Sequence, residues 1–196
     1  GLGKVRLTPD YRIAMQQKGM RLDFNAIAKG YAVDRLGVML EDKGAADYLV
    51  EVGGELRTLG INQIKEQPWV VGIDDPQVLE GRKIKQIITL SDRSMASSGN
   101  YRKFRVDSVS GKKYVHTIDP RTGYTKDSRI LAVSVLAETC MRADGFATAF
   151  MAMDLEASKR ILEADDSLEG YIIYLDESGA TTEYMTPGFK AVLQQD

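Results

Sequence analysis

The sequence has only one cysteine, Cys140, and only one histidine, His116, among its 196 residues. A single cysteine excludes a disulfide within the chain and a zinc site built from several cysteines, while it fits either a reducing or an oxidising compartment. Basic residues are not in excess either, because 26 Lys and Arg stand against 28 Asp and Glu, a formal net charge of −2. The chain therefore offers no basic face for nucleic acid, and local sites have to recognise any substrate.

Long apolar runs and a leader sequence are also missing. No run reaches the roughly 18 apolar residues that a membrane-spanning helix needs, and the start, GLGKVRLTPDYRI, lacks the basic-then-apolar pattern of a signal peptide, which predicts a soluble chain. Without repeats, low-complexity segments or linkers, a single domain over residues 1–196 is expected. The chain begins without methionine and enters two short predicted strands about a Pro-Asp turn, which indicates a piece of a longer protein.

The patterns that are present alternate between hairpins and helices. A helix is predicted over 25–43, capped by Asn25 and ended by Gly44, and two more helices are predicted between 141 and 165. The apolar stripe of the first helix consists of Ile27, Tyr31, Leu36, Met39 and Leu40. The predicted strands and hairpins lie at 47–59, with a Gly-Gly turn, and at 69–74, 83–90, 101–119, 130–137 and 170–186.

Hairpins separated by helices favour an α+β fold over strict strand-helix alternation. We therefore expect an antiparallel sheet built of hairpins, with helices packed on one face.

The segment DFNAIAKGYAVD is unusual for a helix that only packs against a core. Lys29 and Gly30 lie in its first turns, where glycine costs about 1 kcal/mol relative to alanine. The positive end of a helix, a lysine and a residue without a side chain together suit phosphate oxygens. Alternatively, Lys29 faces solvent and Gly30 allows close packing on the sheet.

The segment YVHTIDPRTGY places His116 near the end of a predicted strand. A histidine there can act as a general base near neutral pH, because its unperturbed pKa is about 6.5. The alternative is a surface or core histidine whose hydrogen bonds are satisfied.

The segment MRADGFATAF places Asp144 and Thr148 four residues apart, so a carboxylate and a hydroxyl share one face of a helix. These are hard oxygen ligands of the kind that Mg²⁺ takes in an incomplete shell, which leaves positions for water and substrate phosphates. A helix start with a favourable acidic residue and a threonine packed by its methyl group is an equal alternative.

The segment SMASSGNYRKF is predicted to be a loop of small and polar residues. Gly99 and its hydroxyl-bearing neighbours let a planar ligand or a phosphate approach the backbone. The alternative is an ordinary polar loop without a ligand.

Taken together, these segments resemble the FAD:protein FMN transferases of the ApbE family. That family carries a segment of the form D-(L/F)-x-x-I-A-K-G-(Y/F)-A-V-D, which Asp23 to Asp34 match, followed by a Gly-Gly hairpin like EVGGELRTLG. A (T/S)SG-(D/N)-Y loop, an H-x-I-D-P-x-T-G turn and an A-D-x-x-A-T helix start follow in the same order. Here they are Ser97 to Tyr101, His116 to Gly123 and Ala143 to Thr148.

The resemblance implies a role for each site residue. Mg²⁺ is held by the main-chain carbonyl of Ala26 together with Asp144 and Thr148. The residues implied in the FAD site are Asp23, Lys29, Gly30 and Thr117, the last standing where the family usually has Ile or Val. His116 and Asp144 are the implied catalytic residues, His116 as the base.

The reaction implied by the resemblance moves FMN from FAD to a Thr or Ser hydroxyl of an acceptor flavoprotein subunit and releases AMP. The implied fold is the ApbE fold, which is T-fold-like, and this chain matches its C-terminal portion. The implied location is the periplasmic side of the bacterial inner membrane, with membrane contact only through a lipid anchor absent from this chain. An FAD-binding or FAD-hydrolysing relative and a non-catalytic structural fragment that self-associates remain alternatives.

Overall fold

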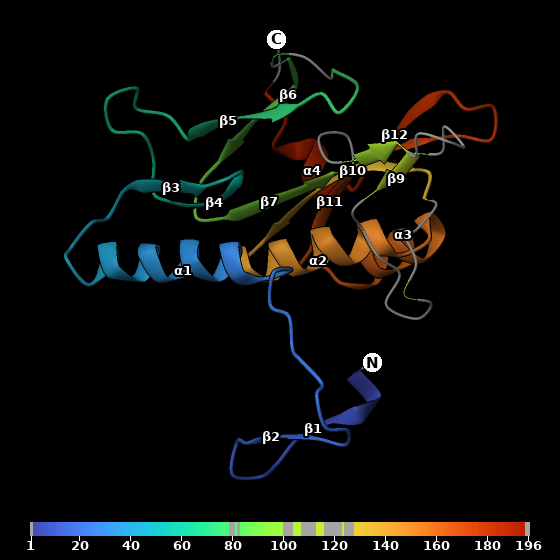
Figure 1. Cartoon of the computed structure of the whole chain (residues 1–196). Coiled ribbons are helices and arrows are strands. Elements are labelled where there is room, and N and C mark those ends of the chain that lie inside the picture. The colour runs from blue at the N-terminus through green and yellow to red at the C-terminus, as the bar shows by residue number, and fades with distance from the viewer. Residues whose placement is uncertain are drawn as a thin grey trace.

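The computed structural model describes residues 2–78, 81, 83–99, 123 and 128–194, and the backbone of 104–106 and 113–115. Figure 1 shows the arrangement of its elements. The helices are η1 (Leu2–Lys4), α1 (Ala28–Glu41), α2 (Cys140–Ala152), α3 (Leu155–Ala164) and α4 (Pro187–Ala191). The strands are β1 (Val5–Leu7), β2 (Ile13–Met15), β3 (Tyr48–Val52), β4 (Glu55–Leu59), β5 (Trp69–Asp74), β6 (Ile84–Leu90), β7 (Ser94–Gly99), β8 (Phe104–Val106), β9 (Lys113–Val115), β10 (Ile130–Ala137), β11 (Glu169–Leu175) and β12 (Thr181–Met185).

The centre of the fold is a six-stranded antiparallel sheet with the strand order β12-β11-β10-β7-β4-β3. The β3-β4 hairpin turns on Gly53 and Gly54, which both have positive φ angles that glycine adopts without steric cost. Three further antiparallel pairs, β1-β2, β5-β6 and β8-β9, lie outside this sheet. The predicted α+β class with an antiparallel sheet is confirmed.

The two faces of the sheet are covered differently. Helices α1, α2 and α3 lie along one face, whereas the β5-β6 hairpin and the short helix α4 lie on the other (Figure 1). Because neighbouring strand residues point to opposite faces, Ala96 packs under the helices while Met95 packs under the hairpin. The three longer helices thus share one face, as expected, and α4 adds Phe189 to the core of the opposite face.

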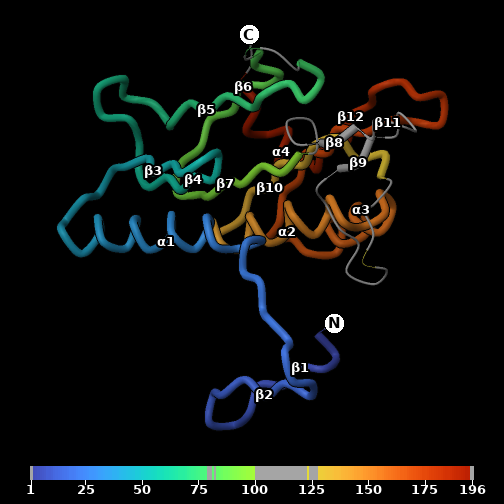
Figure 2. The backbone as a smooth tube through the Cα atoms, in the orientation of Figure 1, coloured from blue at the N-terminus to red at the C-terminus, as the bar shows by residue number. Residues whose placement is uncertain are grey.

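The N-terminal hairpin β1-β2 extends away from the helix layer, and residues 16–27 lead from it back to α1 (Figure 2). No helix within the described ranges is long and apolar enough to cross a membrane.

Helix α1 differs from its prediction in two ways. It starts at Ala28 after Ile27 as N-cap, so the predicted cap, Asn25, is wrong. The predicted apolar stripe is also wrong, because Tyr31 and Met39 are 54% and 45% exposed, whereas the buried residues are Gly30, Val33 and Gly37. Two of the three are glycines because this face approaches the backbone of Cys140 on α2 and the side chains of Tyr48 on β3 and Arg57 on β4 at close range. The left-handed residue after α1 is Gly44, as predicted, with a φ of 85°.

Candidate active site

The start of α1 meets the start of α2 on the helix face of the sheet. The N–H of Gly30 donates to Oδ2 of Asp144 at 2.9 Å. Asp34, one turn further along α1, accepts from the N–H of Cys140 at 2.9 Å and from the N–H of Met141 at 2.8 Å. The first N–H groups of a helix have no partner within the helix and carry the positive end of its dipole, so a carboxylate beside the start of α2 is favourable. The two segments predicted to form one site therefore lie together.

The packing of α1 against α2 leaves no room for a side chain at Gly30. A Cβ at this position would lie 2.4 Å from the carbonyl oxygen of Cys140 and 2.7 Å from Cα of Met141. Both are backbone atoms, which cannot rotate away as a flexible side chain could. Gly30 thus allows close packing, as the alternative held, but against the start of α2 rather than on the sheet as predicted, and a contact between this residue and FAD stays a prediction.

Replacing Gly30 with alanine is expected to lower the free energy of unfolding by about 3 kcal/mol, because α1 has to move away from α2. Urea denaturation measures this change. Gly3→Ala is the matched control, since no atom lies within 4 Å of its added Cβ, and it should change stability by less than about 0.5 kcal/mol. Equal stability of the Gly30 variant and the parent protein would contradict the close approach of the two helices.

Two buried carboxylates and one ammonium group lie beside this junction. Glu55, the first residue of β4, is 1% exposed, and Asp144 is 3% exposed. Nζ of Lys29 lies 2.5 Å from Oε2 of Glu55, and the Lys29 side chain is half-exposed. Burial raises the pKa of both carboxyls above their ordinary values, and the Lys29 ammonium partly offsets this rise. The negative charge of Asp144 raises the pKa of Glu55 further.

The raised pKa values predict a pH dependence of stability. Between the ordinary pKa of a carboxyl and its raised value in the fold, the folded state binds more protons than the unfolded state, so the free energy of unfolding falls as pH rises. The Glu55→Gln variant lacks one such group and should show a shallower fall above pH 4.5, where Glu55 ordinarily titrates. Urea denaturation across a pH series tests this, and identical pH profiles for the variant and the parent would contradict it.

The predicted magnesium ligands lie at the same junction. Asp144 and Thr148 stand one turn apart on α2, and Ala26 lies in the turn that leads into α1. Cγ2 of Ile27, the residue after Ala26, is 3.2 Å from the position that a Cβ on Gly145 would occupy, so this turn packs against α2 next to Asp144. In the described part of the chain no three His, Cys, Asp or Glu residues form a metal cluster, so carbonyl and hydroxyl oxygens would have to complete the shell.

The charge of the cluster suits a cation. Glu55 and Asp144 contribute two negative charges against one positive charge from Lys29, and the donors are the hard oxygens that Mg²⁺ prefers. The residues present therefore fit this metal, and coordination by Ala26, Asp144 and Thr148 stays a prediction.

Of the other predicted site residues, the structure describes Asp23 but not His116 or Thr117. Asp23 is exposed and its Oδ1 accepts from the N–H of Asn25 at 2.8 Å, which shapes the turn before α1. His116 and Thr117 lie outside the described residues, so their predicted roles stay predictions.

The predicted loop at 94–104 is wrong for its first six residues. Ser94–Gly99 form β7, a central strand of the sheet. Oγ of Ser97 lies 2.8 Å from Oγ of Ser134 on β10, and Oγ of the buried Ser94 donates to the carbonyl oxygen of Glu138 at 3.3 Å. Small polar residues can thus occupy a central strand when a neighbouring strand satisfies them.

Sequence reasoning missed two residues of this site, Asp34 and Glu55. Both lie inside the quoted motifs, one at the end of the α1 segment and one directly after Gly53-Gly54. An acidic residue that follows a tight turn at the start of a buried strand was the available signal for Glu55.

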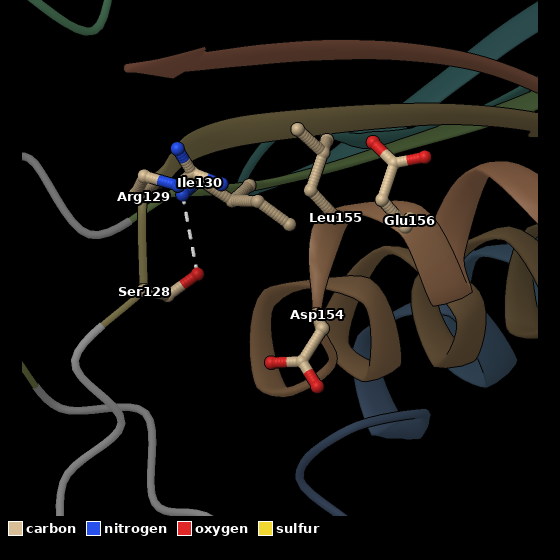
Figure 3. A pocket seen from close by; sticks show the side chains of 6 residues that line it. All are labelled: Ser128, Arg129, Ile130, Asp154, Leu155 and Glu156. Atoms are coloured by element: carbon tan, nitrogen blue, oxygen red, sulfur yellow. Dashed lines mark hydrogen bonds between the residues drawn. The ribbon is translucent and has the colours of Figure 1, made fainter. Parts of the chain in front are cut away.

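A pocket of about 260 Å³ lies elsewhere, between the start of β10 and the start of α3 (Figure 3). The residues that line it are Ser128, Arg129, Ile130, Asp154, Leu155 and Glu156. None of them belongs to the predicted site, so this pocket does not mark the junction of α1 and α2.

Comparisons with known proteins identify the family of this chain. The sequence profile of the ApbE family matches residues 1–172. The FAD:protein FMN transferase of Haemophilus influenzae is 34% identical over 186 residues, which are 93% of this chain and 53% of that protein. The FAD:protein FMN transferase of Vibrio cholerae is 36% identical over 174 residues, which are 89% of this chain and 50% of that protein.

Solved structures show the same fold. The flavin transferase ApbE from Vibrio cholerae matches with a TM-score of 0.83 and 32% identity, over 98% of this chain and 59% of that one. The ApbE protein from Thermotoga maritima matches with a TM-score of 0.81 and 29% identity, over 100% of this chain and 60% of that one. The chain spans about half the length of the curated relatives it matches. With the profile covering most of its residues and the fold shared with these structures, this chain belongs to the ApbE family.

Proposed function

We propose that the full-length protein is an FAD:protein FMN transferase that uses Mg²⁺ to move FMN from FAD to a Thr or Ser hydroxyl of an acceptor flavoprotein. Family membership and relatives that carry this name support the proposal. The structural observation that carries it is the meeting of Lys29 and Gly30 on α1 with Asp144 on α2, which gathers a cation, a helix start and a buried carboxylate.

In the proposed reaction the acceptor hydroxyl oxygen attacks the FMN-side phosphorus of FAD. The bond between that phosphorus and the bridging oxygen breaks, AMP leaves with this oxygen, and a phosphoester links FMN to the acceptor. His116 accepts the hydroxyl proton, and Lys29 donates hydrogen bonds to the pyrophosphate oxygens. Bound Mg²⁺ would offset the negative charge on the pyrophosphate and on the leaving phosphate.

The remaining residue roles follow the same proposal. Ala26, Asp144 and Thr148 hold the metal, while Asp23, Gly30 and Thr117 line the FAD site beside Lys29. Their support is the position of each in a family motif and, for Asp144, its burial beside the start of α1, where it accepts from the N–H of Gly30. We place the protein in the bacterial cell envelope, on the periplasmic side of the inner membrane, by the same family resemblance.

The test mixes the full-length protein with FAD, Mg²⁺ and an acceptor that bears the target threonine. Mass spectrometry should show one FMN phosphoester on the acceptor and AMP in solution. An acceptor with valine in place of that threonine and a reaction with EDTA are the controls, and both should stay unmodified. Free FMN and AMP with an unmodified acceptor would identify an FAD hydrolase instead, because water would have replaced the hydroxyl.

A further inference from the structure

Glu55 and the Gly53-Gly54 turn before it both contact the side chain of Lys29. The lysine Nζ lies 2.5 Å from Oε2 of Glu55. Along its stem, Cδ of Lys29 lies 3.7 Å from the position that a Cβ on Gly53 would occupy, so the Gly53-Gly54 turn passes close beside it. The β3-β4 hairpin thus contacts the lysine at both its stem and its head.

The Lys29-Glu55 pair is not explained by stability. Glu55 is 1% exposed, and removing a carboxylate from water carries a large free-energy cost, which the attraction to one half-exposed ammonium offsets only in part. The raised pKa of Glu55 agrees with this, because burial and the charge of Asp144 together raise it by more than the Lys29 ammonium lowers it. An apolar residue at the start of β4 would avoid this cost. The presence of a carboxylate therefore indicates a functional role rather than a stabilising one.

A fixed ammonium is useful to an anionic ligand. A free lysine side chain has high conformational entropy, part of which is lost each time a ligand has to order it. The ammonium has three N–H donors, so an ion pair with one carboxylate oxygen leaves donors for a ligand on the exposed side of the half-exposed Lys29 side chain. A ligand then meets donors that are already in place.

We propose that Glu55 is a positioning residue that holds the Lys29 ammonium toward the pyrophosphate of FAD. This inference rests on the proposed function. It assigns no contact between Glu55 and FAD, because Glu55 acts through Lys29. The β3-β4 hairpin therefore belongs to the ligand site through this one ion pair.

The ion pair itself is tested by thermal unfolding of the full-length protein without ligand. Lys29→Met leaves Glu55 buried without its cation and should lower the midpoint by about 10 °C. Glu55→Gln leaves only a half-exposed ammonium, which water can solvate, and should lower it by less than about 3 °C. The double variant should recover most of the loss caused by Lys29→Met, whereas additive effects would overturn the pair.

The positioning role is tested by steady-state flavin transfer. Glu55→Gln should raise KM for FAD about fivefold to tenfold, the cost of ordering one free lysine, with kcat changed less than about threefold. A variant that was merely unfolded in part would lose kcat and keep KM. In the Lys29→Met background, Glu55→Gln should leave KM unchanged, because the group it positions is gone.

Glu51→Gln is the matched control. Glu51 lies on the other side of the same turn, is exposed, and accepts from the N–H of Gly54 rather than from Lys29, so its variant should keep the parental KM. An unchanged or lower KM for Glu55→Gln would overturn the positioning role while flavin transfer by the parent protein left the proposed function intact. A parent protein that neither binds FAD nor transfers flavin would overturn both.

Discussion

Asp144→Ala in the full-length protein is expected to reduce magnesium-dependent flavin transfer by roughly a thousandfold or more. Asp144 is the only charged side chain among the proposed ligands Ala26, Asp144 and Thr148, so its removal takes away most of the attraction for the cation. Loss of a metal that stabilises charge in the transition state by several kcal/mol corresponds to a rate loss of this size. Initial rates measured over a range of Mg²⁺ concentrations give the effect.

The fold should survive this change, with a modest loss of stability. Alanine removes a costly buried carboxylate but leaves the N–H of Gly30 without its partner, a penalty of about 1–3 kcal/mol. Asp144→Asn is the matched variant, because its amide oxygen can still accept from Gly30 while its charge is gone. If both variants lose Mg²⁺ binding in calorimetry and keep a cooperative unfolding transition, the effect lies in the metal site. Parental activity in either variant would reject Asp144 as a ligand.

His116→Asn is expected to slow flavin transfer by about 10²-fold to 10⁴-fold, the usual contribution of a positioned general base. Asparagine keeps a polar group of similar size but cannot accept the hydroxyl proton. The affinity for FAD should change little, because the proposed role of His116 is in proton transfer. Rapid-quench measurement of the transferred flavin gives the rate, and titration of FAD fluorescence gives the affinity.

The pH dependence separates a base from a residue that only shapes the site. With His116 as base, the rate of the parent protein should rise with pH through the range in which histidine loses its proton, since only neutral imidazole can accept another. This rise should be absent from the His116→Asn profile. A variant that transfers flavin at the parental rate across that range would remove His116 from the mechanism.

Local sequence determined the hairpins and the segments that carry the site. The Gly53-Gly54 turn, the apolar run at 130–137 and the left-handed Gly44 each depend on residues that are neighbours in the chain, so their patterns predict β3-β4, β10 and the conformation of Gly44 correctly. Helix α1 ends at Glu41, two residues before the predicted end at Lys43. The order of the motifs likewise identified the family that the profile and the solved structures show.

Tertiary structure alone decided which groups meet. The packed face of α1 carries Gly30 and Gly37 beside Val33 because the backbone of Cys140 lies against Gly30, a contact that no helical periodicity can show. The hydrogen bond from Gly30 to Asp144 spans 114 positions in the sequence, and the bond from Cys140 to Asp34 spans 106. Likewise, Ser94–Gly99 form a central strand because β10 and β4 pair with its backbone on either side. Such contacts depend on how the sheet brings distant segments together, and the pattern of one segment does not contain that information.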